Sequence, residues 1–160
     1  MAEKQAVLGM HVAAGVAHLA LVHKPAVHDL SGLATLEPAA NLAPWHGLRQ
    51  FGERLVADAR SFGVVCLAIA ETRKYDKWGY RDAYGRASLE VAAGLATSSA
   101  GIDVRTIVQR TAATSLDIDE TEIPKQVAEH LGVVPTRGDH WKERAPAFLV
   151  ALHVAKQLWP

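Results

Sequence analysis

Five side chains in three parts of the chain could bind a metal ion or transfer protons. His11 lies in the first apolar stretch, Glu71 directly follows another apolar run, and Asp139, His140 and Glu143 lie just before the last one. Carboxylate oxygens suit Mg²⁺ and Mn²⁺, whereas imidazole suits zinc, copper, iron and nickel. One interpretation is therefore a mixed site for a single transition-metal ion, formed by His11, Glu71 and His140.

These residues also have ordinary structural interpretations. No short-spaced ligand pair such as His-x-x-x-His supports a transition-metal site. Each histidine could be a partly buried side chain held by a hydrogen bond, and Glu71 could form a salt bridge with Arg73 or Lys74. Sequence alone leaves both interpretations open.

Residues 73–86, here called the basic-aromatic segment, have the most unusual local composition in the chain. They interleave all three tyrosines and one tryptophan with lysine and arginine. Stacking on bases and neutralising phosphates require this combination, but Tyr, Trp and Arg are also enriched at subunit interfaces. The candidate nucleic-acid-binding residues are Arg73, Lys74, Tyr75, Lys77, Trp78, Tyr80, Arg81 and Arg86.

Length and composition predict one soluble domain over residues 1–160. The chain is 49% hydrophobic, which is enough for a substantial core. Its 17 basic and 17 acidic residues cancel, so any surface that attracts phosphate must be a local patch. The single cysteine, Cys66, lies in an apolar run and is expected to be a buried thiol.

No feature of the sequence predicts export or a membrane location. A single cysteine cannot form an internal disulfide, which favours a reducing compartment. Residues 1–5 do not form a signal peptide, and no apolar run approaches the roughly 20 residues needed to cross a bilayer. We expect a cytoplasmic protein.

The element order predicts a mixed α/β sheet with helices on both faces. Residues 6–37 are expected to form a meander of three antiparallel strands, and Pro44 to open a helix that Gly63 ends. A buried strand at 64–70, a long helix ending at Gly101 and a strand at 102–108 follow. The remainder is predicted as a helical turn at 112–118, a helix at 122–131, a loop at 133–141 and a last helix from Pro146 toward Leu158. Five strands are expected in the sheet.

This order is the one that the RNase H-like fold uses, and two motifs resemble the RuvC-type Holliday-junction resolvases more specifically. The run Leu-Gly-Met-His at 8–11 resembles the family's first strand, Leu-Gly-Ile-Asp, with His11 at the catalytic aspartate. Glu71 resembles the catalytic glutamate, and residues 84–93 resemble the Gly-x-Ala-Arg-Gly helix start that follows it.

The second half of the chain extends the resemblance. Residues 102–108 and 124–127 are similar to the family's fifth strand and its Lys-x-Gln-Val helix. Residues 145–152 resemble the Asp-Ala-Ala-Asp-Ala-Leu-Ala helix without either aspartate, and Arg144 and Ala147 are the matching positions. The resemblance covers nearly the whole chain, and it rests on the succession of motifs.

The resemblance implies a two-metal nuclease site that this chain has largely lost. Enzymes of this fold clamp two divalent cations about 4 Å apart between carboxylates. His11 cannot bridge two Mg²⁺ ions, and Arg144 would repel them. Only Glu71 matches directly, although Asp139, His140 and Glu143 could shift into place if the preceding loop is longer here.

The leading hypothesis is a catalytically degenerate, RuvC-like pseudoenzyme that binds branched or single-stranded nucleic acid as a homodimer. DNA is favoured over RNA, with a role in DNA recombination. One alternative is an active endonuclease that uses Mg²⁺ or Mn²⁺ with a rearranged ligand set of Glu71, Asp139, His140 and Glu143, with or without His11. The other is a protein-interaction scaffold, favoured if Trp78 and Tyr80 are buried between subunits.

Overall fold

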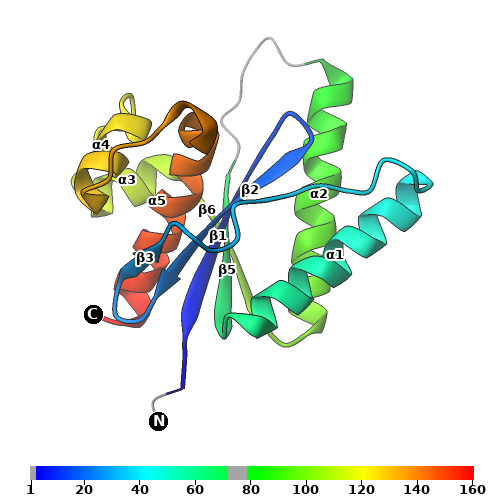
Figure 1. Cartoon of the computed structure of the whole chain (residues 1–160), viewed down its shortest axis with the longest axis horizontal. Helices are drawn as coiled ribbons and strands as arrows, with labels where there is room; N and C mark the ends of the chain where they lie inside the picture. The colour runs from blue at the N-terminus through cyan, green and yellow to red at the C-terminus, as the bar shows by residue number, and fades with distance from the viewer. Residues whose placement is uncertain (1–2, 72–78) are drawn as a thin grey trace.

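A computed structural model describes residues 3–71 and 79–160 (Figure 1). Its centre is a mixed sheet in the order β3-β2-β1-β5-β6. The strands are β1 (Ala6–Ala13), β2 (Val16–His23), β3 (Val27–Asp29), β4 (Thr35–Leu36), β5 (Val64–Ala70) and β6 (Asp103–Ile107). β1 pairs antiparallel with β2 and parallel with β5, and β5 pairs parallel with β6. This confirms the predicted mixed α/β sheet.

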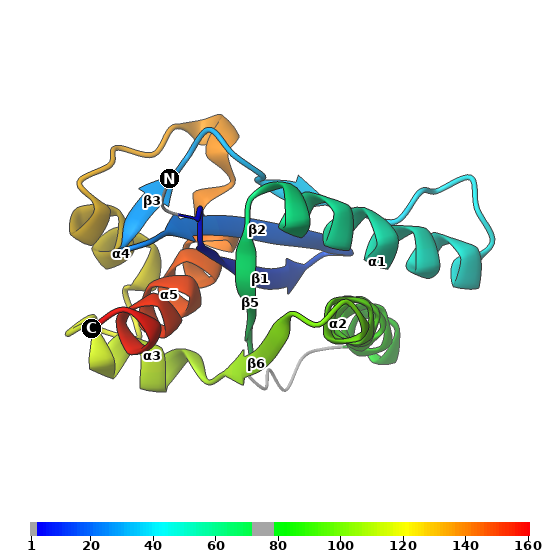
Figure 2. The ribbon, with the colours of Figure 1, turned by 90° about the horizontal axis from the view of Figure 1, so that it is seen from below.

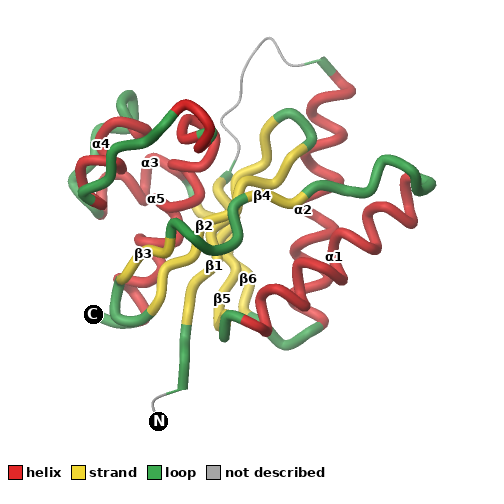
Figure 3. The backbone as a smooth tube through the Cα atoms, viewed as in Figure 1, coloured by secondary structure: helices red, strands yellow, loops and turns green. Residues whose placement is uncertain are grey.

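The meander at the start of the chain differs in detail from the prediction. Its expected third strand is divided into β3 and β4, which both pair with β2 (Figure 3). The division lies at Ser31 and Gly32, whose backbone N–H groups donate to the Asp29 carboxylate at 3.0 Å each instead of to a neighbouring strand. Within the described residues the sheet therefore has six strands, with β4 as a short addition beside β2.

Helices cover both faces of the sheet, as predicted (Figure 2). On one side lie α1 (Pro44–Ser61) and α2 (Tyr80–Ser99); on the other lie α3 (Gln109–Ser115), α4 (Ile123–Leu131) and α5 (Trp141–Leu158). Alternate residues of β1 enter two separate cores, with Leu8 and Met10 packing toward α1 and Val7 toward α5. No helix in the described part of the chain is long and apolar enough to cross a membrane.

Several local predictions are confirmed. Pro44 opens α1, and Gly63 and Gly132 follow α1 and α4 with φ of +67° each, which only glycine adopts without cost. Cys66 is buried, and burial raises the pKa of its thiol to about 11. The thiol is therefore a packing group and not a nucleophile.

Two helix boundaries were predicted wrongly. The short helical turn expected at 112–118 is α3 at Gln109–Ser115, and it ends before Asp117, which has a φ of +56°. The last helix begins at Trp141, so Pro146 lies inside it rather than at its start. A proline there costs one backbone hydrogen bond, which burial of the next turns of α5, including Phe148 and Leu149, offsets.

Candidate functional site

His11, near the end of β1, lies against the first turn of α5. Its imidazole Nδ1–H donates to the backbone carbonyl of Glu143 at 2.6 Å, which leaves the lone pair on Nε2 in the neutral ring. Two residues earlier, Gly9 allows α5 this close, because a Cβ at Gly9 would overlap the carbonyl oxygen of Ala147. The glycine and the hydrogen bond together hold the imidazole in one orientation.

A cleft of about 420 Å³ opens beside His11. Its lining comes from β1, the starts of α3 and α5, the loop before α4 and the first turns of α2 and α4. The lining residues are His11, Ala13, Arg86, Gln109, Glu120, Thr121, Ile123, Pro124, Lys142, Glu143 and Pro146. Here called the His11 cleft, it brings together two of the predicted metal or catalytic residues, His11 and Glu143.

Sequence reasoning missed Gln109, which lines the His11 cleft together with Lys142. Gln109 directly follows β6, at the edge where the parallel strands β5 and β6 end. In open α/β sheets, ligands bind outside the carboxyl ends of parallel strands, so the position of Gln109 after a predicted strand was an available signal.

One basic residue of the predicted nucleic-acid-binding set, Arg86, lines the His11 cleft, and a second, Arg81, lines a neighbouring hollow. Arg86, on α2, has a side chain that is only 12% exposed and pairs with Glu90 at 3.3 Å. It also lines an adjoining hollow beside the β1–β2 turn, together with Arg81. Tyr80 is exposed on the first turn of α2, and its ring stacks on that of Tyr84 with 6.1 Å between centroids. Arg73, Lys74, Tyr75, Lys77 and Trp78 lie outside the described residues.

Glu71 follows β5 but does not line the His11 cleft. Its backbone N–H donates to the Ile107 carbonyl at 2.8 Å, and its carbonyl accepts from Gln109 Nε2 at 3.1 Å, while the residue as a whole is exposed. With the described residues, the hydrogen bonds of Glu71 are thus made by its backbone. The salt bridges suggested with Arg73 and Lys74 fall outside the described residues.

Asp139 and His140, the other members of the rearranged ligand set, lie away from the His11 cleft. The Asp139 carboxylate accepts the Thr136 backbone N–H at 2.6 Å, and the Thr136 hydrogen bonds lower the pKa of Asp139. His140 precedes α5 with a φ of +47°, and its ring centroid is 6.3 Å from that of buried His18. The structure therefore brings only Glu143 of this upstream group to His11.

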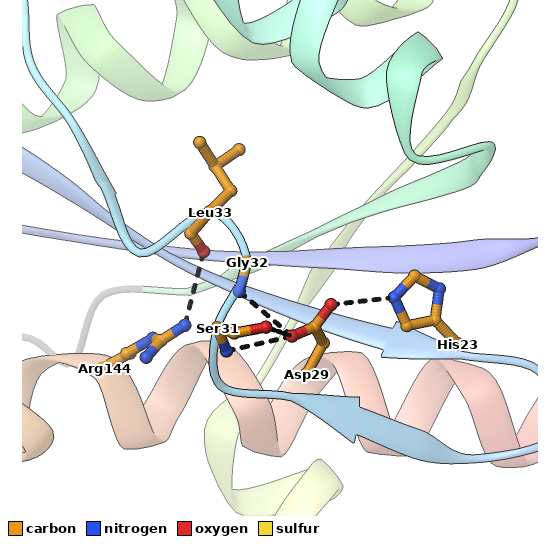
Figure 4. A network of polar contacts seen from close by, with 6 residues as sticks. All are labelled: His23, Asp29, Ser31, Gly32, Leu33 and Arg144. Carbon is orange, nitrogen blue, oxygen red and sulfur yellow. Dashed lines mark hydrogen bonds and ion pairs between the residues drawn. The ribbon is translucent and has the colours of Figure 1, made fainter.

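Arg144 is where the structure corrects the sequence interpretation most clearly (Figure 4). It does not line the His11 cleft: its guanidinium is buried on the other side of α5, 5.1 Å from the Phe148 ring centroid. Arg144 Nε donates to the Leu19 carbonyl at 2.9 Å and Nη2 to the Leu33 carbonyl at 3.4 Å. Arg144 thus fastens α5 to β2 and to the 30–34 turn, and it is not a charge that repels cations from the cleft.

Ala147, the second position matched to an aspartate, is also absent from the cleft lining. It is fully buried where α5 meets Gly9. The α5 residues that line the cleft are Lys142, Glu143 and Pro146, and the last two each lie one residue before a matched position. The match to the aspartate motif was therefore displaced by one residue, which on a helix turns a side chain by about 100°.

The described residues do not fit a pair of hard divalent cations. Throughout 3–71 and 79–160, no group of three histidine, cysteine, aspartate or glutamate residues is placed to hold a metal ion. The proposed transition-metal trio of His11, Glu71 and His140 is therefore not brought together. Magnesium needs several oxygen ligands, and at His11 one nitrogen is already occupied by the Glu143 carbonyl.

His11 is expected to stay neutral far below the usual histidine range. Burial lowers its pKa to about 4; the hydrogen bond to Glu143 opposes the shift, and Arg86 adds to it. The unfolded chain then binds more protons than the folded one between pH 6.5 and pH 4, so His11 destabilises the protein progressively as the pH falls through this window, by up to about 3 kcal/mol. An NMR titration of the His11 ring should give a midpoint near 4, and a midpoint near 6.5 would contradict this environment.

Comparison with solved structures identifies the fold. The chain superposes on Thermus thermophilus RuvC in complex with a Holliday junction substrate with a TM-score of 0.74 and 18% identity, over 96% of this chain and 94% of that one. A second Thermus thermophilus RuvC structure gives a TM-score of 0.73 at 17% identity, over 96% of this chain and 95% of that one. The yeast mitochondrial Holliday junction resolvase Ydc2 gives 0.63 at 8% identity, over 94% of this chain and 77% of that one.

The sequence itself matches no protein-family model and no curated protein. At these identities the superpositions show the fold alone. The predicted RuvC-like fold is therefore confirmed.

Proposed function

We propose that this protein binds branched or single-stranded nucleic acid, DNA in preference to RNA, as a catalytically degenerate relative of the RuvC resolvases. The observation that carries this proposal is the composition of the His11 cleft. It keeps cationic and amide side chains, Arg86, Lys142 and Gln109, at the edge of a resolvase-like sheet, while the Glu71 carboxylate lies outside it. One of the solved structures with this fold is a complex with a Holliday junction.

The arrangement of basic residues supports binding to phosphates. Arg81 and Arg86 line one hollow, and Arg86 also lines the His11 cleft with Lys142, so the three residues border two neighbouring depressions that share Arg86. Such a row can follow a nucleic-acid backbone, and exposed Tyr80 offers a ring for base stacking. The carboxylates nearby reduce the attraction; one of them, Glu120, lies 3.8 Å from Arg110. Binding should therefore be moderate in strength and sensitive to salt.

The side chains that could serve as metal ligands in the His11 cleft also support catalytic degeneracy. His11 offers a single ring nitrogen where a two-metal site needs an oxygen bridge, and Pro146 offers no ligand at all. Glu143 and Glu120 are the only carboxylate residues among the described ones that line the cleft. We therefore expect binding without cleavage, in a protein whose cytoplasmic location stays a prediction.

The test is binding of a labelled four-way junction, a duplex and a single strand, measured by fluorescence anisotropy across salt concentrations. We expect affinity to fall steeply with salt, and the exposed Arg81→Ala variant to weaken binding and reduce the slope of log K against log salt by about 1. Arg54→Ala removes the same charge from an exposed position of α1 and should bind like the wild type. No salt-sensitive binding to any of the three would end this proposal.

One observation favours the active-endonuclease alternative, namely that Glu143 reaches the cleft beside His11. A carboxylate there could join Glu71 only if a ligand drew the Glu71 side chain inward. Cleavage that depends on Mg²⁺ or Mn²⁺ and requires both glutamates would favour this alternative.

A further inference from the structure

His11 presents a hydrogen-bond acceptor to the His11 cleft. Its Nδ1 lies 2.6 Å from the Glu143 carbonyl oxygen, which can only accept, so the ring proton is on Nδ1 and Nε2 carries a lone pair. None of the described residues donates a hydrogen bond to this Nε2. Burial lowers the pKa of the ring to about 4, so Nε2 remains an acceptor at neutral pH. A ligand that contacts Nε2 must therefore supply a donor.

A phosphodiester linkage does not satisfy this acceptor. Its oxygen atoms carry no hydrogen, so a phosphate placed against His11 would leave Nε2 buried without a partner. Phosphate oxygens are bound instead by cations, and Arg86 and Lys142 line the same cleft. An internal stretch of DNA backbone would therefore satisfy the two cations but not the imidazole.

The carboxylates of the cleft disfavour a strand that continues through it. Arg86 comes from α2, as does Arg81 in the adjoining hollow. Glu120 and Glu143 come from the loop before α4 and from α5, across the sheet from α2 (Figure 1), and Lys142 is the one cation among the described lining residues on that side. A strand is thus attracted along α2, and phosphates placed further in are repelled. This distribution favours a strand that ends in the cleft.

The end of a DNA strand has a donor that its internal backbone lacks, namely the hydroxyl group of the last sugar. Strands normally end in a hydroxyl on the 3′ side and in a phosphate on the 5′ side, and only the hydroxyl can donate to a neutral imidazole. The base N–H groups of paired nucleotides are already used in pairing. The cleft volume of about 420 Å³ is at the small end of the range for ligand pockets, which suits one terminal nucleotide rather than a duplex.

We propose that the His11 cleft binds the 3′-hydroxyl end of a DNA strand, with the hydroxyl donating to His11 Nε2 and the preceding phosphates bound along Arg86 and Arg81. This inference rests on the proposed nucleic-acid binding and names the form of DNA that is recognised. A nick, a flap or a frayed arm supplies such an end. His11 is then the residue that selects the ligand, and not only the place where a metal ligand was lost.

The first test uses the wild-type protein and changes only the strand. Three single strands of one sequence, labelled at the 5′ end and ending in a 3′-hydroxyl, a 3′-hydrogen (dideoxy) or a 3′-phosphate, are titrated at low salt by fluorescence anisotropy. The 3′-hydroxyl strand should bind about five- to tenfold more tightly than the dideoxy strand, which corresponds to the loss of one hydrogen bond. The 3′-phosphate strand should also bind more weakly than the 3′-hydroxyl strand, whereas attraction to cations alone would make it bind more tightly.

Two variants assign this preference to His11. His11→Asn keeps an N–H near the position of Nδ1 but has no acceptor at the position of Nε2, so it should bind the hydroxyl and dideoxy strands equally. Arg81→Ala should weaken binding of both strands and keep their ratio. ¹⁵N NMR of the wild type reports the contact without a substitution, because the His11 Nε2 resonance should shift with the hydroxyl strand and not with the dideoxy strand.

The outcomes separate this inference from the proposed function. Equal binding of the hydroxyl and dideoxy strands by the wild type, or an unchanged preference in a folded His11→Asn variant, would overturn the inference and leave nucleic-acid binding intact. An RNA strand blocked at its 3′ end that bound as tightly as the hydroxyl DNA strand would also overturn it, because internal 2′-hydroxyl groups would then be the donors. Absence of binding to every strand would end the proposed function itself.

Discussion

Gly9→Ala is expected to lower the free energy of unfolding by about 3 kcal/mol or more, which is at the upper end of overpacking effects. The added methyl group would overlap the Ala147 carbonyl oxygen, and its nearest side-chain neighbour would be Ala151 Cβ at 3.0 Å. Backbone cannot swing aside as a flexible side chain can, so β1 and α5 must separate. The loss should be visible in urea unfolding followed by circular dichroism.

A matched glycine separates this effect from the general cost of adding a methyl group. Gly85 lies within α2, and a Cβ there would meet nothing within 4 Å. Because alanine is the better helix former, Gly85→Ala should raise the free energy of unfolding by up to about 1 kcal/mol. If both variants were as stable as the wild type, the close packing of α5 on Gly9 would be wrong.

Arg144→Ala should cost about 2–4 kcal/mol of stability. The substitution leaves two carbonyls, those of Leu19 and Leu33, without their guanidinium partner and removes the contact with the Phe148 ring. Burial lowers the pKa of Arg144, because removing the cation from water costs free energy in the folded protein. The effect is therefore less than a buried ion pair of ideal geometry would give.

The control for Arg144→Ala is Arg137→Ala, at an exposed position in the turn before α5. It should change the free energy of unfolding by less than about 0.5 kcal/mol. Arg144→Lys should fall between the two, because an ammonium can reach one carbonyl but not fork between both. An Arg144→Ala variant as stable as the Arg137→Ala variant would mean that the guanidinium does not fasten α5 to β2.

The sheet and most of its helices could be predicted because local signals and burial agreed there. The helix ends at Pro44, Gly63 and Gly132 follow from residue type, because proline suits a first turn and glycine suits the positive φ found at Gly63 and Gly132. The start of α5 could not be predicted, because Pro146 is a strong signal for the first turn of a helix. The packing of α5 against β1 and β2 overrode that signal.

The site was predicted less well than the fold, for a geometrical reason. His11 and Glu143 were both named as candidates, and the structure brings them together. Arg144 was assigned to the site because a weak motif cannot be aligned to within one residue. On a helix, that one-residue displacement moves the side chain from the cleft to the core. Gln109 comes to the cleft only through the pairing of β5 with β6, a contact between distant parts of the chain.

The central claim is binding without two-metal cleavage, and one measurement tests it most directly. A labelled four-way junction is bound by the wild-type protein at low salt, Mg²⁺ or Mn²⁺ is added, and bound and cleaved fractions are followed in the same reaction. The account predicts a complex whose junction stays intact with either ion. Divalent-dependent cleavage that disappears in Glu71→Ala, a change at an exposed residue whose contacts are made by the backbone, would contradict it.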